Sequence, residues 1–478
     1  MKRILVKKII VVAFLVFLAG VSRGAVFCVS TAMELQNALD TAETNGEDDI
    51  IQVVQGTYSG NFYYYSSEGC SITLLGGYTS DCADRVVDPS YTVLDGGGSG
   101  MVLRLNNSNG GDILIEGFTI QNGAGNDYGV GVYAQSQSDS GAAGNVTLNN
   151  NIIKGNTATG NYIGGGVSAW SRSDSDPTGN VILTNNIITG NTSGGWAGGV
   201  SAGTYSQAGI AGDVIATNNI ITGNTAYDYG GGIEAVTNSP SGTAGNIILT
   251  NNTITENTAN SGGGGLSIYL PANRNLYVYN NIIWGNMAPV GGDIYIWPWG
   301  PGIPNGYNND YSDMYGSWTN SGNNINEDPF FVGGDNYRLQ DISPCIDAGD
   351  NFAPELPVFD FDGNPRIMDG DSDGNAIVDM GAYEFEKLTP EEKIENLIDD
   401  IIDKVNSGEL NKGSGNALNS KLERALERLN AGNTIAACNL LRAFVHQVNA
   451  FIRSGFLTEE EAQVMIDAAN EVINELCG

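Results

Sequence analysis

Acidic side chains near residue 370 have the spacing most suggestive of chemistry in this chain. In "DGDSDGNAIVDMGAYE" carboxylates alternate before Gly374, as they do in calcium loops, because Ca²⁺ binds six to eight hard oxygen atoms. Met380 stands at the twelfth position, where an EF-hand has glutamate, and an acidic turn in solvent would show the same residues. We expect one structural Ca²⁺ ion, with the ligands Asp369, Asp371, Asp373 and Asp379.

Aromatic residues stand just before short glycine runs in the middle of the chain. If successive segments stack, these rings form a flat apolar ridge, which suits the faces of sugar rings. The alternative is that the rings only cover glycine-rich turns, and we assign Trp297 and Trp299 to packing. The predicted carbohydrate-contacting residues are Tyr128, Tyr162, Trp196, Tyr227 and Tyr229.

The central region offers few groups for catalysis. A polysaccharide lyase needs a basic side chain beside bound calcium, but the basic residues here hold unrelated positions: Lys154, Arg172 and Arg274. Arg172 is expected in a variable loop. Asp228 and Glu234 are the best-placed carboxylates, yet acidic residues are common throughout the chain. We therefore predict no catalytic residue, and we expect the only histidine, His446, to be structural.

A repeated segment must supply the elements that position these side chains. "TNNIITGNTA" at residues 217–226 belongs to a set of six repeats, which begin at Ile115, Leu148, Leu183, Ala216, Leu249 and Val278. A period of about 33 residues indicates a solenoid, whose units bury their apolar sides only by stacking. Each unit holds three short runs rich in β-branched residues, separated by Asn or Gly turns, so we predict three strands per turn of a parallel β-helix.

Stacking also explains the repeated asparagines. Rungs about 4.8 Å apart place equivalent side chains above one another, so that amides can bond along the stack. We expect one ladder of Asn185, Asn218, Asn251 and Asn280. The second expected ladder consists of Asn191, Asn224, Asn257 and Asn286.

The chain begins like an exported protein. Residues 1–24 combine a basic start with an apolar core, which predicts a secretory signal peptide that is removed, and no later segment is expected to span a membrane. Export makes the cysteines candidates for disulfides. We prefer the pairs Cys70–Cys82 and Cys438–Cys477, and leave Cys28 and Cys345 unassigned. An amphipathic helix within residues 30–49 would cap the stack at its N-terminal end.

From residue 388 the composition changes to charged residues interspersed with Leu, Ile and Ala. Thr389, Pro390 and Glu392 form the start signal of a helix, with Thr389 as N-cap. Two further helices are expected from about Ala417 and Thr434, and another follows Thr458. We predict a small helical bundle.

Three segments resemble known bacterial families. The "GGGV" at Gly164, the "GGGI" at Gly230 and the repeat are similar to right-handed parallel β-helix proteins with polymorphic outer-membrane-type repeats. "EDPFFVGGDNYRLQDISPCIDAGDN" and "VDMGAYEF" resemble the end of the choice-of-anchor Q family, and the tail resembles the FIMAH domain. The implied organisation is a cap and right-handed β-helix at residues 25–326, a closing segment at 327–387 and a FIMAH-like domain at 388–478.

These features favour a secreted or cell-surface protein. The net charge of −33 repels phosphate backbones, so nucleic acid is not an expected partner. The resemblance implies surface association, and we expect a rigid scaffold that binds an extracellular glycan or cell-surface component. Two alternatives are a lyase or glycoside hydrolase acting on acidic polysaccharide, and a purely structural spacer.

Overall fold

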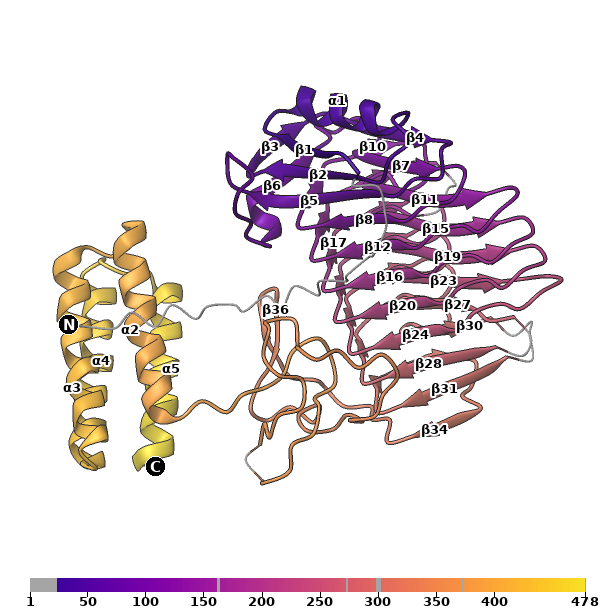
Figure 1. Ribbon diagram of the computed structural model, residues 1–478. Helices are drawn as coiled ribbons and strands as arrows, with labels where there is room; N and C mark the ends of the chain where they lie inside the picture. The colour runs from indigo at the N-terminus through magenta and orange to yellow at the C-terminus, as the bar shows by residue number, and fades with distance from the viewer. Residues whose placement is uncertain (1–23, 161–163, 272–273, 298–301, 372, 478) are drawn as a thin grey trace. The chain divides into compact units, whose positions relative to one another are not determined.

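The computed structural model describes residues 24–477 except 161–163, 272–273, 298–301 and 372. Short strands stack in parallel register from coil to coil, and Figure 1 shows the rungs succeeding one another in chain order. This arrangement is the predicted right-handed parallel β-helix. The predicted signal peptide (residues 1–24), Tyr162 and Trp299 lie wholly or almost wholly outside the described residues.

Three long sheets form the sides of the β-helix. Sheet A comprises β1 (Val26–Val29), β2 (Asp49–Val54), β5 (Ile72–Tyr78), β8 (Ile113–Glu116), β12 (Val146–Asn149), β16 (Val181–Thr184), β20 (Val214–Thr217), β24 (Ile247–Thr250), β28 (Asn275–Tyr279), β31 (Ile303–Tyr307) and β34 (Asn320–Gly322). Sheet B comprises β3 (Gly56–Ser59), β6 (Thr92–Asp95), β9 (Thr119–Gln121), β13 (Ile152–Lys154), β17 (Ile187–Thr189), β21 (Ile220–Thr222), β25 (Thr253–Thr255), β29 (Ile282–Trp284) and β32 (Asp310–Tyr311).

Sheet C comprises β4 (Phe62–Ser66), β7 (Leu103–Asn107), β11 (Val132–Ser138), β15 (Val167–Ser173), β19 (Val200–Ser206), β23 (Ile233–Asn238), β27 (Leu266–Tyr269), β30 (Ile294–Ile296) and β33 (Met314–Tyr315). A smaller sheet D comprises β10 (Ala124–Gly125), β14 (Thr157–Ala158), β18 (Thr192–Ser193), β22 (Thr225–Ala226) and β26 (Thr258–Ala259). Five successive coils, from β8 to β27, pass through sheets A, B and D before they reach sheet C, and among the described residues the coils before and after them have strands in sheets A, B and C alone.

The core runs along the inside of the coils. Strand residues alternate in direction, so the same positions of successive coils meet inside, as Val200, Ile233 and Leu266 do in sheet C. Two turns per coil are lined by asparagine amides. In the turn between sheets B and D, Asn191, Asn224, Asn257 and Asn286 bond side chain to side chain at 2.9–3.0 Å, as predicted.

Of the other predicted ladder only the link from the Asn280 amide to Asn251 Oδ1, at 3.3 Å, is found among the described residues, and the continuous ladder is displaced by one residue. Asn185, Asn218 and their equivalents adopt a left-handed backbone at φ 55° to 56°, which turns the chain at the corner between sheets A and B. The next asparagine points inward instead. The observed ladder therefore consists of Asn151, Asn186, Asn219, Asn252, Asn281, Asn309 and Asn324.

Helix α1 (Ala32–Ala42) caps the N-terminal end of the stack. Thr31 and Glu34 form a capping box, and Leu35 and Leu39 face the core. A 3-10 turn, η1 (Pro89–Tyr91), follows β5. Together α1 and the first strands close the hydrophobic interior that the repeats leave open at their start.

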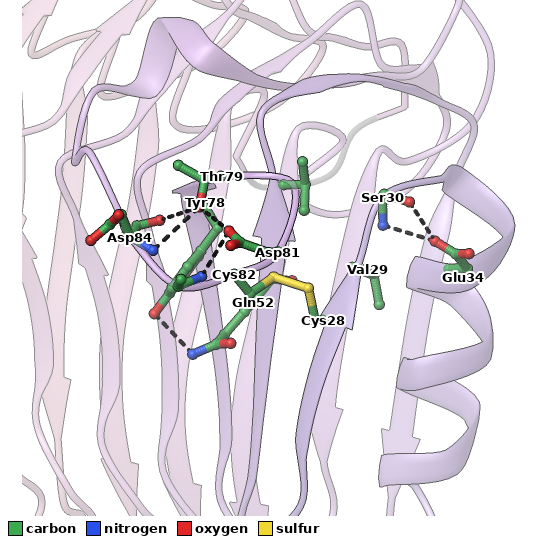
Figure 2. Close-up of a disulfide and its surroundings, with 12 residues drawn as sticks. Cys28, Val29, Ser30, Glu34, Gln52, Tyr78, Thr79, Asp81, Cys82 and Asp84 are labelled. Carbon is green, nitrogen blue, oxygen red and sulfur yellow. Dashed lines mark hydrogen bonds between the residues drawn. A yellow bond between two sulfur atoms is a disulfide. The ribbon is translucent and has the colours of Figure 1, made fainter.

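The predicted Cys70–Cys82 disulfide is wrong. Cys28 of β1 pairs with Cys82, as Figure 2 shows, because β1, β2 and β5 lie side by side in sheet A. Cys70 precedes β5 and Cys82 follows it, so an extended strand of roughly 23 Å separates two cysteines that are close in sequence. Cys70 and Cys345 are free thiols.

The closing segment covers part of sheet B. It contains a short hairpin, β35 (Phe331–Gly333) and β36 (Asn336–Leu339), followed by loops. Ala382 and Tyr383 pack on Ile220 of β21. The corner residues that were expected to form a ladder hold this segment: the Asn218 amide donates to Phe359 O at 2.7 Å and the Asn251 amide to Asp379 O at 2.9 Å.

Residues 386–478 form a second compact unit. It consists of α2 (Pro390–Ser407), α3 (Lys412–Asn430), α4 (Thr434–Arg453) and α5 (Glu459–Cys477). Thr389 caps α2 as predicted, whereas α3 begins at Lys412, after the N-cap Asn411 and five residues before the expected Ala417. The predicted Cys438–Cys477 disulfide joins α4 to α5.

Helix α4 is the one helix among the described residues that is long and apolar enough, by length and composition, to cross a membrane. Its buried face, which includes Leu441, Phe444 and Val448, belongs to the hydrophobic core of the four helices. The exposed His446 lies on the same helix.

Candidate functional site

Every second residue of sheet C points out of the β-helix, and the register brings these residues into columns. One column runs through Ser168, Ser201, Glu234, Ser267 and Tyr295. Whereas the closing segment packs on sheet B, sheet C is bordered by glycine-rich turns that precede its strands. Side chains of these turns can therefore meet outward side chains of the strands.

Five aromatic side chains meet at this border, which we call the aromatic cluster: Trp196, Tyr229, Tyr295, Trp297 and Tyr315. The rings of Trp196 and Trp297 are stacked, with centroids 5.7 Å apart and planes inclined by 7°. Tyr229 contacts both Trp297, at 4.8 Å, and Tyr295, at 5.3 Å. Four of the rings are half-buried, and Tyr315 is exposed. The cluster thus keeps apolar ring surface in contact with solvent.

Glycines make this packing possible. Trp196, Tyr229 and Gly262 occupy equivalent positions in three successive coils. A Cβ atom at Gly262 would lie 2.9 Å from the ring of Tyr295 and 3.1 Å from that of Tyr229. The absence of a side chain at Gly262 therefore lets the rings from β30 and from the preceding turn approach each other.

The predicted ridge is only partly the observed cluster. Trp196 and Tyr229 belong to it, but Tyr227 lies two residues earlier in its coil and is 63% exposed. Tyr128 lines a different pocket, nearer the N-terminal end of sheet C. Tyr295, Trp297 and Tyr315 were missed as binding candidates, although the alternation in "IYIW" places Tyr295 on the outer face.

Glu234 is the buried acid of this face. Its neighbours Ile233 and Ala235 point into the core, so its side chain is directed outward, yet only 5% of it is exposed. The Ser201 hydroxyl donates to Oε2 at 3.2 Å, and Trp297 covers Ser267 on the next rung through an Nε1–Oγ hydrogen bond of 3.1 Å. Burial raises the pKa of Glu234 from 4.5 to about 7. This carboxyl group can hold a proton near neutral pH.

The other candidate groups of the central region do not join Glu234. Asp228 lies in the turn between β22 and β23, where its N–H donates to Gly195 O at 2.9 Å, and none of the hydrogen bonds found among the described residues connects it to Glu234. Arg172 lies in β15, not in a loop, and its guanidinium sits 4.9 Å over the ring of Tyr205. The two acids therefore share no hydrogen bond among the described residues.

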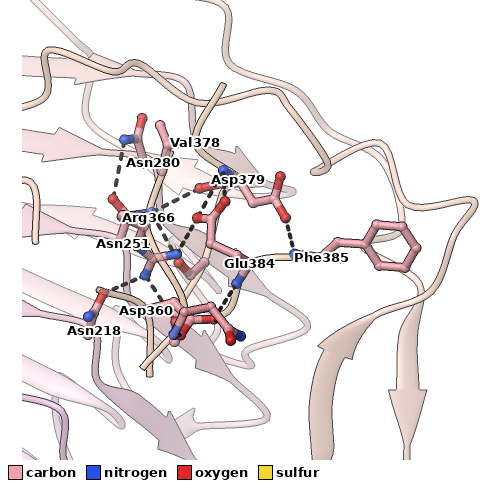
Figure 3. A network of polar contacts seen from close by, with 12 residues as sticks. Asn218, Asn251, Asn280, Asp360, Arg366, Val378, Asp379, Glu384 and Phe385 are labelled. Atoms are coloured by element: carbon pink, nitrogen blue, oxygen red, sulfur yellow. Dashed lines mark hydrogen bonds and ion pairs between the residues drawn. The ribbon is translucent and has the colours of Figure 1, made fainter. Parts of the chain in front are cut away.

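A buried polar network holds the closing segment together, as Figure 3 shows. Arg366 and Glu384 form an ion pair of 2.6 Å, and both side chains are 1% exposed. Arg366 also donates to Asn218 Oδ1 and Ala382 O. Burial and the charge of Asp379 raise the pKa of Glu384, and the Arg366 guanidinium opposes this rise. The network fastens the segment to sheet B.

Of the four expected calcium ligands, the structure brings two together and leaves the other two apart. Asp369 and Asp371 lie with Asp347, and one carboxylate oxygen of each falls within 4.8 Å of the others. Asp373 instead accepts hydrogen bonds from Asn375. Asp379 is buried, where it accepts from the N–H groups of Asp347 and Phe385. Oxygen ligands of this kind fit Ca²⁺.

Two family models match the chain. The model of the right handed beta helix region matches residues 99–310, and that of the FIMAH domain matches residues 392–474. The chain carries a right-handed β-helix followed by a FIMAH domain. The comparison with curated proteins returned no match. The resemblances to polymorphic outer-membrane-type repeats and to choice-of-anchor Q stay predictions. A β-helix with disulfides is compatible with an extracellular scaffold or a polysaccharide-related protein.

Proposed function

We propose that this chain is an exported surface or extracellular scaffold whose β-helix binds glycans on the outer face of sheet C. The aromatic cluster carries this proposal. Its half-buried rings present apolar faces and edges suited to sugar rings, and the hydroxyl groups of Tyr229, Tyr295 and Tyr315 can form hydrogen bonds. Ring contact combined with hydrogen bonding is the chemistry that sugars require.

Export is supported by other features of the chain. The apolar start predicts a signal peptide. Disulfides occur in both compact units, Cys28–Cys82 in the first and Cys438–Cys477 in the second, and such bonds persist in oxidising compartments. A glycan or another cell-surface component is the partner that we propose there.

Binding of the full chain to a panel of polysaccharides by affinity electrophoresis tests this function. We expect Trp196→Ala and Trp297→Ala to weaken binding by about tenfold, because each removes one large contact face. Tyr227→Ala is the matched control, since it removes an exposed aromatic ring outside the cluster. Absence of binding to every polysaccharide, or an equal loss in the control, would contradict the proposal.

The buried Glu234 favours one second candidate, cleavage of an acidic polysaccharide. A carboxyl group that stays protonated near pH 7 can act as a general acid on a glycosidic oxygen, and this role requires that substrate gain access to the buried Glu234. If this candidate is correct, the full chain releases reducing ends from an acidic polysaccharide, and the Glu234→Gln variant does not. If neither binding nor cleavage occurs, the chain would be a structural spacer that holds its FIMAH domain away from the cell.

We also propose a structural Ca²⁺ ion at the closing segment, held by Asp369 and Asp371. Asp347 lies beside both and would complete three carboxylate ligands. Calcium at millimolar concentration should then give the chain a higher melting temperature than a chelator does. Asp371→Asn should abolish this difference. If the unaltered chain has the same melting temperature in calcium and in chelator, the proposed calcium site is wrong.

A further inference from the structure

A pocket of about 260 Å³ lies on sheet C between β11 and β15. Tyr133 and Gln135 come from β11, and Ser168, Trp170 and Arg172 come from β15. Tyr128, from the turn before β11, completes the lining. Six side chains that can stack or form hydrogen bonds thus surround one cavity, and the lining contains a cation but no carboxylate.

Two arginines of this region have no acidic partner. The guanidinium of Arg172 sits over the ring of Tyr205 at 4.9 Å, and that of Arg104 sits over Tyr133 at 5.1 Å. Among the described residues neither enters an ion pair, although the chain has 54 acidic and only 21 basic residues. Both cations can therefore meet an anion from outside the chain.

Three carboxylates lie near this pocket along the strands and turns, and one of them, Asp174, two residues after Arg172, is exposed to solvent. Asp127 accepts from the N–H of Tyr128 at 3.0 Å, and Asp139 accepts from the Gln137 amide at 3.3 Å. Both carboxylates are exposed to solvent, which screens their effect on a ligand held by Arg172.

The shape of the pocket is fixed by its surroundings. The Trp170 ring lies over Gly203 of the next rung, where any Cβ atom would overlap ring atoms. Gln135 accepts a hydrogen bond from the Tyr133 hydroxyl and donates to Gln137 at 3.0 Å. Both the stacking surface and the hydrogen-bonding groups are therefore oriented before any ligand arrives.

We propose that this pocket binds an anionic sugar unit, bearing a carboxylate or a sulfate, within a polysaccharide that runs along sheet C. Arg172 would pair with the oxyanion, since the planar guanidinium donates to two oxygens at once. Trp170 would stack on the sugar ring, and Gln135 would bond its hydroxyls. The inference rests on the proposed glycan binding and adds the charge class of the ligand.

Affinity electrophoresis of the full chain in matched gels tests the inference. Polygalacturonate is compared with its methyl ester, and dextran sulfate with dextran, so that each pair differs only in the anion. We expect tighter binding to at least one anionic member, and the pair that shows it identifies carboxylate or sulfate. Arg172→Gln should weaken that binding at least about tenfold. Lys154→Gln, which removes an exposed cation from sheet B, should leave it unchanged.

Other outcomes overturn the inference in distinguishable ways. One such outcome is that the chain binds neutral and anionic polysaccharides equally, that Trp297→Ala weakens binding to both, and that Arg172→Gln weakens binding to neither. This result would support the proposed glycan binding and contradict the anionic pocket. If Lys154→Gln weakens binding as much as Arg172→Gln, the attraction is general charge and not this pocket. If no gel retards the chain, both proposals fall. Melting temperatures within a few degrees of the unaltered chain show that each variant is folded.

Discussion

Individual asparagines hold the coils in register. Asn224 is fully buried and its amide donates to Ile188 O at 2.8 Å and Asn257 Oδ1 at 2.9 Å. Its own Oδ1 accepts from both the backbone N–H and the amide of Asn191 at 3.0 Å. Each ladder member therefore satisfies groups in the coils on both sides, which a buried polar column requires.

Replacing Asn224 with alanine should destabilise the β-helix unit by about 1–3 kcal/mol, because the two Asn191 donors lose their acceptor inside the core. Denaturant unfolding of the variant measures this cost. Asn260→Ala, at an exposed position, is the control and should stay within about 0.5 kcal/mol of the unaltered chain. If Asn224→Ala has the same free energy of unfolding as the unaltered chain, the ladder contributes little to stability.

Glu234 links stability to pH. Its pKa of about 7 in the folded chain lies above its ordinary 4.5, so the folded state binds more protons than the unfolded state between these values. The resulting stabilisation is complete below pH 4.5 and is lost as pH rises through 7. Glu234→Gln should reduce the fall in unfolding free energy between pH 4.5 and 8 by roughly 3 kcal/mol.

Chemical unfolding at those two pH values checks the effect. Asp174→Asn, which changes an exposed carboxylate, should leave the pH dependence of the unaltered chain intact. An unaltered dependence in Glu234→Gln as well would mean that this carboxyl group titrates normally in the folded protein.

At the scale of elements, the closing segment is held on sheet B by buried polar contacts as well as by apolar packing. Arg366 is the centre of these contacts, since it bonds Glu384, Asn218 and the carbonyl of Ala382. Removing one partner of a buried ion pair leaves the other charge uncompensated. The segment should therefore be far more sensitive to this arginine than to any exposed one.

Arg366→Ala should cost about 3–5 kcal/mol and release the segment locally. Faster hydrogen exchange within residues 358–385 measures the release. Arg338→Ala breaks a more exposed ion pair with Asp362 and should cost under about 1 kcal/mol. Similar exchange rates in the two variants would refute the role given to Arg366.

The coils could be predicted from the sequence because the spacing between repeated segments gives the length of one coil directly. The prediction failed where contacts join segments that are distant in sequence. Nothing near Arg366 indicates that its partners are Glu384 and a corner asparagine of another coil. The same reason explains why Cys28, not Cys70, reaches Cys82. Tyr295 and Tyr315 were not predicted as binding residues because the last coils lack a clear copy of the repeat, so their positions could not be aligned with those of earlier coils.

At the scale of the whole molecule, sheets B and C of the β-helix differ in what lies on their outer faces. Sheet B is partly covered by the closing segment, whereas sheet C carries the aromatic cluster and, nearer its N-terminal end, the pocket of Arg172. The rungs between them extend the same outer face. A long polymer could contact both sites, while a single sugar could contact only one.

Hydrogen exchange of the full chain, with and without a polysaccharide that it retains, tests the central claim most directly. We predict slower exchange in the turns at residues 195–199 and 227–232 and in β30, with no change in β13 and β17 of sheet B. Protection confined to the FIMAH domain, or protection of sheet B in place of sheet C, would contradict binding on the outer face of sheet C.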